Sequence, residues 1–384
     1  MKIAVLISGL FLLMMNFVSA QAVKPGAEQP GRYLPLLKGR KVAIVVNPTS
    51  RIGKQHLADF LQEEQVELKK IFTPEHGLRG ETGAGERVNN HTDAATGLPV
   101  ISLYGNTRKP TEEELEGIDV VVFDLQDVGV RFYTYLSTLF YVMEACAEQD
   151  IPLVVLDRPN PNGDYVAGPV LKPEFRSFVG MIPVPVVHGC TLGELAEMIN
   201  GEGWLAGGAC CRLTVVPVAN YTHRTSYSLP VKPSPNLPND AAVRLYPSLC
   251  FFEATHASIG RGTIFPFQVI GYPDPSMGRF MFTPRDRPGA CNPVQEGKAC
   301  FGDDLRLTGP EERFTLVYFM KYYNRFSEEK IFLRSEHWFN LLAGTDRVLM
   351  DIRAGKTLDE IEASWKEDLD RYRQLRCKYL LYPE

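Results

Sequence analysis

Residues 41–47, KVAIVVN, begin a series of short apolar runs that decides the fold. Each run is long enough for a buried β-strand, and the segments between the runs have apolar residues at helical spacing. The later runs are VELKKIF (66–72), LPVISLYG (98–105), IDVVVFDLQDVG (118–129), IPLVVLDRPNP (151–161) and CRLTVVPV (211–218). Apolar strands that alternate with helices predict an α/β fold with a doubly wound, Rossmann-like parallel sheet.

The alternation stops at a proline-rich segment, SLPVKPSPNLPND (228–240). We place a domain boundary there, with a Rossmann-like catalytic domain over 31–232 and a smaller α/β domain over 233–384 that closes a cleft. The second domain is expected to contain one strand, three helices and a closing strand, in the order FPFQVIGYP (265–273), 311–326, 335–342, 357–369 and RCKYLLY (376–382).

The first twenty residues have the features of a secretory signal. Met1 and Lys2 precede an apolar run that ends at Ser19 and Ala20. We expect cleavage near Ala20 and export of the mature chain to the periplasm or the extracellular space, although an uncleaved anchor would have a similar sequence. No later run is apolar enough, over sufficient length, to predict a membrane span.

The composition is that of a globular protein, with 45% apolar and 23% charged residues among 384. A net charge of -5 gives no basic footprint for nucleic acid. The eight cysteines permit disulfides in an exported chain. Cys291 and Cys300, which flank a polar loop, are the expected pair, and Cys146 is expected to be a buried thiol.

Ligands of open parallel sheets lie outside the carboxyl ends of the strands. Three of the predicted strands place pairs of polar residues at that edge, namely Glu75 with His76, Asp124 with Asp127, and Asp157 with Arg158. Single strand-end carboxylates are common in turns and caps, but three converging pairs predict a binding or catalytic site.

The first pair lies in a glycine-rich stretch, IFTPEHGLRGETGAGERV (71–88), which also contains Arg79. Glycines at this density allow the backbone to approach a ligand closely. A carboxylate beside an imidazole suits proton exchange near neutral pH, although a plain surface turn would also explain one such pair.

Further candidates follow in chain order. Arg131, Tyr133 and Tyr135 would suit a sugar and its carboxylate, and His188 is either a ligand contact or a structural histidine. Glu253 and Arg261 occupy a glycine-flanked patch that either closes the cleft or forms a charged turn. We find no G-x-G-x-x-G, Walker or G-x-S-x-G motif, so dinucleotide binding and serine-elbow chemistry are not predicted.

Together these motifs resemble the exo-β-N-acetylmuramidase (NamZ-like) family over nearly the whole mature chain. The resemblance rests on FTPEHGLRG (72–80) with AGE (84–86), FDLQDVGVRFYTY (123–135), LDRPNPNG (156–163), HGCTLGELAEMIN (188–200), PSPNLP (233–238) and FEATHASIGRGT (252–263). It implies release of N-acetylmuramic acid from the non-reducing ends of peptidoglycan fragments such as MurNAc–GlcNAc saccharides. It implies neither a metal nor a nucleotide cofactor.

Glycoside hydrolysis commonly needs one carboxylic acid and a second group that acts as nucleophile or base. We predict Glu75 as a catalytic carboxylate assisted by His76, with Asp124, Asp127 or Glu253 as the second group. Retaining, inverting and substrate-assisted mechanisms remain open. The lactyl carboxylate of muramic acid calls for a cation, for which Arg131, Arg158 and Arg261 are candidates.

Two other functions would fit parts of this pattern. A non-catalytic periplasmic muropeptide-binding protein would use the same cleft without turnover. An esterase or amidase would need a serine or cysteine nucleophile or a metal centre, for which the sequence has no motif.

Overall fold

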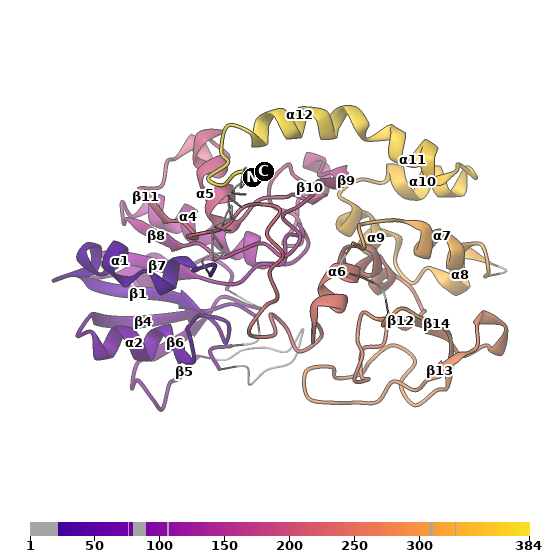
Figure 1. The fold of residues 1–384 in the computed structure, drawn as a ribbon, viewed down its shortest axis with the longest axis horizontal. Helices are drawn as coiled ribbons and strands as arrows, with labels where there is room; N and C mark the ends of the chain where they lie inside the picture. Colours follow the sequence, from indigo (N-terminus) through magenta and orange to yellow (C-terminus); the bar gives the residue numbers. More distant parts are fainter. Residues whose placement is uncertain are drawn as a thin grey trace, which may run out of the picture.

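The computed structural model describes residues 22–75, 77–79, 90–105, 107–307, 309, 311–326 and 328–384. Its N-terminal domain is organised on a seven-stranded sheet in the order β11-β8-β7-β1-β4-β6-β5 (Figure 1). The strands are β1 (Lys41–Val46), β4 (Glu67–Thr73), β5 (His91–Thr92), β6 (Pro99–Ser102), β7 (Val120–Asp124), β8 (Leu153–Leu156) and β11 (Leu213–Val216). All neighbours pair in parallel except β5 and β6. The predicted doubly wound α/β fold is therefore confirmed.

Alternation along β1 explains why both faces of the sheet are covered. Val42, Ile44 and Val46 pack in one apolar cluster with α1 (Pro30–Leu37) and α2 (Leu57–Glu63). Ala43 and Val45 face the other side, where the main core includes α4 (Tyr135–Glu148) and α5 (Leu192–Gly201). A strand that is apolar on both faces needs this two-sided cover.

The remaining elements of this domain are short. Thr111 caps α3 (Glu112–Leu115) in a capping box, and Thr191 caps α5 in the same way. Two small hairpins complete the domain, β2 (Arg51–Ile52) with β3 (Gln55–His56) and β9 (Ala167–Val170) with β10 (Pro185–Val187).

The C-terminal domain is smaller and has a three-stranded antiparallel sheet in the order β12-β14-β13 (Figure 1). Its strands are β12 (Val269–Tyr272), β13 (Phe280–Phe282) and β14 (Cys300–Asp304), and its helices before the chain end are α6 (Asp240–Leu249), α7 (Val317–Tyr323), α8 (Glu329–Phe332), α9 (Glu336–Ala343), α10 (Arg347–Arg353) and α11 (Leu358–Ser364). The boundary at residues 232/233 stays a prediction.

Several sequence predictions about this domain are wrong. It has three strands where one was expected, the helix predicted over 311–326 covers only Val317–Tyr323, and the helix predicted over 357–369 is divided between α11 and a later helix. The Cys291–Cys300 disulfide does not form, because Cys300 is a free, buried thiol whose sulfur contacts the carbonyl of Lys298 at 3.7 Å. The closing strand is also absent from the described residues. Instead α12 (Lys366–Arg376) continues through the start of that segment, and an irregular tail follows it. Cys146 is a buried free thiol, as predicted.

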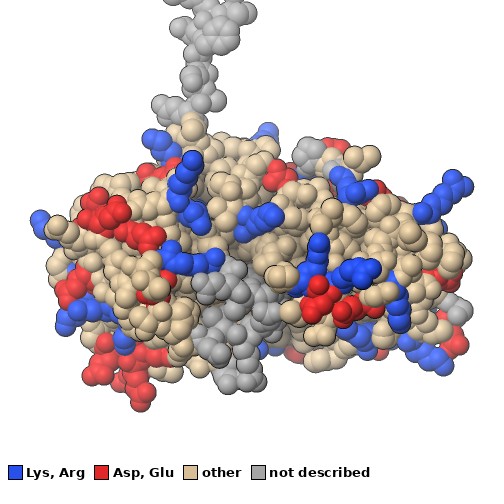
Figure 2. All heavy atoms as spheres, turned by 90° about the horizontal axis from the view of Figure 1, so that it is seen from below, with Lys and Arg blue, Asp and Glu red and all other residues tan. Residues whose placement is uncertain are grey.

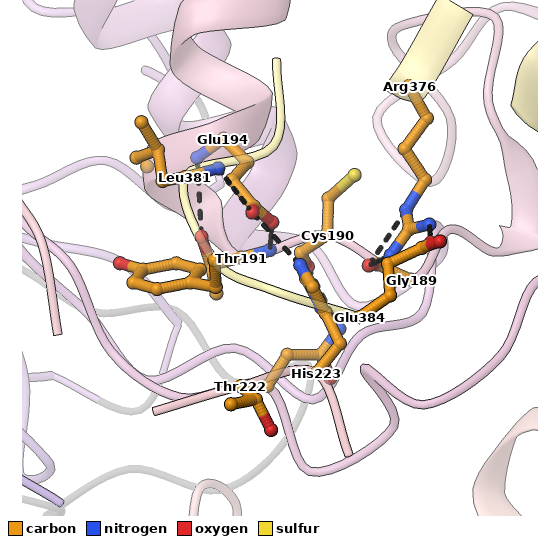
Figure 3. A network of polar contacts seen from close by, with 12 residues as sticks. Gly189, Cys190, Thr191, Glu194, Thr222, His223, Arg376, Leu381 and Glu384 are labelled. Carbon is orange, nitrogen blue, oxygen red and sulfur yellow. Dashed lines mark hydrogen bonds and ion pairs between the residues drawn. The ribbon is translucent and has the colours of Figure 1, made fainter. Parts of the chain in front are cut away.

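Helix α12 carries the chain end back to the N-terminal domain (Figure 1). There the Tyr382 hydroxyl donates to Asp157 at 2.5 Å, and the Leu381 amide donates to Glu194 at 2.9 Å. The same Glu194 pairs with His223 at 3.0 Å, and Arg376 bonds the carbonyl of Gly189 (Figure 3). The tail therefore belongs to the core of the domain that begins the chain.

Asp157 is 1% exposed, and burial raises the pKa of its carboxyl from 3.8 to about 6. A carboxyl with a raised native pKa binds a proton in the folded state that the unfolded state has lost, so it favours folding less as pH rises. This contribution to stability begins to fall near the pKa of the carboxyl in the unfolded state, and it is lost completely above the pKa in the folded state.

Asp157→Asn removes this titration. We expect the free energy of unfolding of the wild type, relative to that of the variant, to fall by roughly 2 kcal/mol between about pH 4 and pH 6, out of about 3 kcal/mol over the whole titration, since one pKa unit corresponds to about 1.4 kcal/mol. Urea denaturation of both proteins across this range measures the difference. A difference that stays constant with pH would contradict the raised pKa.

Candidate active site

The principal cleft lies between the two domains and has a volume of about 940 Å³. Its N-terminal wall includes Glu75 and Tyr104, which follow β4 and β6. Its C-terminal wall includes Glu253, Arg261 and Trp338. Two carboxylates from different domains thus line one cleft, on the side of the sheet edge where β4 and β6 end.

Glu75 is part of a compact polar group around the Tyr104 hydroxyl. Burial raises the pKa of Tyr104, and both the charge of Glu75 and a hydrogen bond with it act in the same direction. The charge of Glu253 raises this pKa further, whereas that of Arg108 lowers it. The phenol is therefore within electrostatic reach of both cleft carboxylates and of one guanidinium.

Glu253 is held in place by an ion pair with Arg261. The guanidinium of Arg261 also lies 5.0 Å from the ring centroid of Phe267. Burial alone would lower the pKa of Arg261, but the charge of Glu253, the hydrogen bond to it and the nearby Tyr246 and Cys250 together raise this pKa. Arg261 lies between two glycines whose backbones have positive φ, 78° at Gly260 and 79° at Gly262. Glycine adopts this conformation without the steric cost that a side chain would bring.

An aromatic group next to Glu75 forms another part of the wall. The rings of Tyr104 and Phe178 are 6.5 Å apart, and Tyr141 stacks on Phe178 at 6.3 Å. Arg108 covers Phe178 with its guanidinium carbon 4.4 Å from the ring centroid. Flat aromatic surface beside polar groups suits a sugar, which has both apolar faces and hydroxyl edges.

The sequence prediction missed Tyr104, Arg108 and Phe178. Tyr104 directly follows the 98–105 run, so the strand-end argument that singled out Glu75 applies to it equally. Arg108 and Phe178 lie in loops without a comparable signal.

Four predicted site residues line the cleft, namely Glu75, Tyr133, Glu253 and Arg261. The predicted partner His76 lies outside the described residues. The other predicted residues do not line the cleft, and each has an internal role.

Asp124 and Arg158 are paired with each other. Asp124 is fully buried and accepts two hydrogen bonds from the guanidinium, at 2.5 Å from Nε and 2.8 Å from Nη2. This pair joins the ends of β7 and β8. Asp157, which was predicted at the same edge of the sheet, binds the C-terminal tail instead. Strand-end position alone made these residues resemble ligand contacts.

Asp127 and His188 are buried together and do not line the cleft. One Asp127 oxygen accepts from the Gly129 amide at 2.6 Å and lies 3.6 Å from Nε2 of His188. The Cys190 amide donates to Nδ1 of His188 at 3.2 Å, so the ring carries its proton on Nε2, facing Asp127. His188 is thus a structural histidine in this geometry, which was one of the two predicted alternatives.

Arg131 is completely buried and connects the two domains. Its guanidinium donates to the carbonyls of Pro169 and Val184, both at 2.8 Å, and of Leu342 at 2.9 Å. Burial lowers the pKa of Arg131 to about 9. It does not contact the cleft, so the predicted role as a lactyl ligand has no support in its position.

The remaining predicted contacts are also engaged internally. The hydroxyl of Tyr133 donates to Pro233 at 2.6 Å, although its ring still lines the cleft, and Tyr135 is buried beside it with a bond from Asn47 at 2.8 Å. Arg79 forms ion pairs with Asp93 at 2.8 Å and Asp59 at 3.0 Å.

Figure 2 shows basic and acidic side chains on both halves of the face seen from below. Within the described ranges, no three His, Cys, Asp or Glu side chains are grouped to hold a metal ion. Nor does any described helix combine the length and apolarity needed to cross a bilayer.

Asp124→Ala tests the structural role of the buried ion pair. We expect the free energy of unfolding to fall by about 3–5 kcal/mol, because Arg158 would stay buried without its counter-ion. The free energy of unfolding should fall less in the double variant Asp124→Ala with Arg158→Met than in Asp124→Ala alone. Urea denaturation of both variants measures this. An unchanged unfolding free energy with lost turnover would instead indicate a catalytic Asp124.

Two family models match the chain. The N-terminal model of exo-β-N-acetylmuramidase NamZ covers residues 42–241, and the C-terminal model of the same family covers residues 244–382. The chain is also 37% identical over 372 residues to peptidoglycan β-N-acetylmuramidase NamZ of Bacillus subtilis (strain 168), a match that covers 91% of this chain and 89% of that protein.

Solved structures agree with this assignment. A DUF1343 family protein from Bacteroides fragilis superposes with a TM-score of 0.88 at 46% identity, covering 95% of this chain and 100% of that one. A second DUF1343 protein from the same organism gives a TM-score of 0.80 at 29% identity, with 94% and 99% covered. The chain therefore belongs to the exo-β-N-acetylmuramidase NamZ family.

Proposed function

We propose that this protein is an exo-acting glycoside hydrolase that releases N-acetylmuramic acid from the non-reducing ends of peptidoglycan fragments. The observation that supports this most is the placement of two carboxylates, Glu75 from the N-terminal domain and Glu253 from the C-terminal domain, in the lining of one cleft. The similarity to the Bacillus subtilis enzyme supplies the substrate class.

Glu75 donates the proton to the glycosidic oxygen as the bond to the leaving sugar breaks. Its neighbour Tyr104 shares a hydrogen bond with it and fixes its orientation. Glu253 is the second carboxylate, positioned by Arg261, and stabilises the positive charge that develops on the sugar ring. A water molecule then bonds to the anomeric carbon and gives up a proton, which restores the acid form of Glu75. Tyr133 and Trp338 provide aromatic walls for the bound saccharide.

The substrates are MurNAc–GlcNAc saccharides, and the enzyme acts on them after export. Export is supported by the apolar segment that precedes Ala20. A muropeptide-binding protein without catalysis would need only the cleft, so turnover is the property that separates the two functions.

Incubation of the mature protein with MurNAc–GlcNAc and with GlcNAc–MurNAc tests both reaction and polarity. We expect N-acetylmuramic acid to be released from MurNAc–GlcNAc and not from GlcNAc–MurNAc. Mass spectrometry detects the free sugar. Binding of either disaccharide without cleavage would favour the binding protein instead.

Glu75→Gln should lower kcat by about 100-fold or more, since it removes the proton that assists departure of the leaving group. Glu116→Gln, an exposed change at the end of α3, is the matched control and should keep full activity. Thermal unfolding of each variant shows that the fold is retained. Full activity in Glu75→Gln would refute the assignment.

A further inference from the structure

N-acetylmuramic acid differs from N-acetylglucosamine by a lactyl ether that carries a carboxylate. An enzyme that selects the first sugar needs a cation beside the ring whose glycosidic bond is cleaved. This requirement rests on the proposed function, and the structure narrows which side chain meets it.

Four arginines that the sequence suggested for substrate contact are already engaged. Arg79, Arg158 and Arg261 have carboxylate partners, and Arg131 is buried among backbone carbonyls. Recruiting Arg158 or Arg131 would break a buried ion pair or expose a buried guanidinium, and both changes are costly. Arg79 does not line the cleft, and Arg261 is already held by Glu253.

Two other arginines line the cleft, Arg108 and Arg334. Arg334 donates to the backbone carbonyl of Glu253 at 2.9 Å, so part of its hydrogen-bonding capacity is used. Arg108 has no carboxylate within ion-pair distance in the part of the chain that the structure describes. Its guanidinium lies over the face of Phe178, and its charge acts on the Tyr104 hydroxyl.

That contact orients Arg108 for a ligand. A guanidinium that stacks on a ring uses its face and leaves the N–H groups at its edge available for a carboxylate. Phe178 lies 6.5 Å from Tyr104, which bonds Glu75, so the chain of contacts leads from Arg108 to the proposed proton donor. The lactyl group and the scissile bond belong to one sugar ring. A cation that binds the lactyl carboxylate must therefore lie near the proton donor, as Arg108 does.

We infer that Arg108 binds the lactyl carboxylate and is the residue that makes the cleft prefer N-acetylmuramic acid to N-acetylglucosamine. Phe178 holds the guanidinium flat, and Tyr104 connects it to the catalytic end of the site. The role is one of substrate recognition, and the proton donor remains Glu75.

The test compares Arg108→Gln with two controls. Arg176→Gln is the matched control, because Arg176 is also an exposed arginine stacked on a phenylalanine, 5.0 Å from Phe140, but does not line the cleft. Arg334→Gln removes the rival cation. Binding of N-acetylmuramic acid and of N-acetylglucosamine is measured by calorimetry for each protein, and kcat/KM is measured with chromogenic β-glycosides of both sugars.

In Arg108→Gln, we expect affinity and kcat/KM for the muramic acid compounds to fall by about 10- to 100-fold, with little change for the glucosamine compounds. Arg108→Lys should recover part of the preference, since it keeps the charge but loses the planar edge. Arg176→Gln should behave as the wild type.

Retained preference in Arg108→Gln, or loss of preference in Arg334→Gln alone, would overturn the inference. So would a wild-type protein that binds both sugars equally. Binding preference that depends on Arg108 in a protein without turnover would sustain the inference and refute the proposed function, so the two failures are distinguishable.

Discussion

The buried ion pair between Asp124 and Arg158 determines where a ligand has room on this sheet. In doubly wound proteins, the usual site is the crevice where the strand order reverses, here between β1 and β7. In this protein, the crevice is filled by the chain itself. The Ser50 hydroxyl donates to the Asp124 carbonyl at 2.5 Å and accepts from the Asn47 amide at 2.9 Å. The open part of the edge is therefore beside β4 and β6.

The second domain forms the other wall of the cleft, beside β4 and β6. The interface between the domains fixes the position of one wall relative to the other. Phe132 packs edge-on against Phe251 at 5.8 Å, and Arg131 bonds carbonyls from both domains. A shared core with a buried cation at its centre resists sliding of one wall past the other. Glu75 and Glu253 can hold a fixed relation across the cleft for this reason, without contact between them being required.

Much of the fold was predictable because the signal is local. Apolar runs of strand length between helical segments leave few arrangements other than a parallel sheet with helices on both faces. The site was only partly predictable because strand-end polarity does not reveal what a side chain pairs with. Glu75 and Asp124 look alike in the sequence, yet one lines the cleft and the other bonds Arg158, 34 residues further on. Arg108 gave no signal, since its partner Phe178 comes from a distant loop.

The attachment of the C-terminal tail also bears on the order of events during synthesis. All strands of the large sheet have been made by Val216, and domains near the N-terminus generally fold first on the ribosome. Here, however, Asp157 and Glu194 accept hydrogen bonds from Tyr382 and Leu381, which lie far beyond Val216 in the chain. The first domain to be synthesised therefore gains these two hydrogen bonds only after residues 381 and 382 have been made.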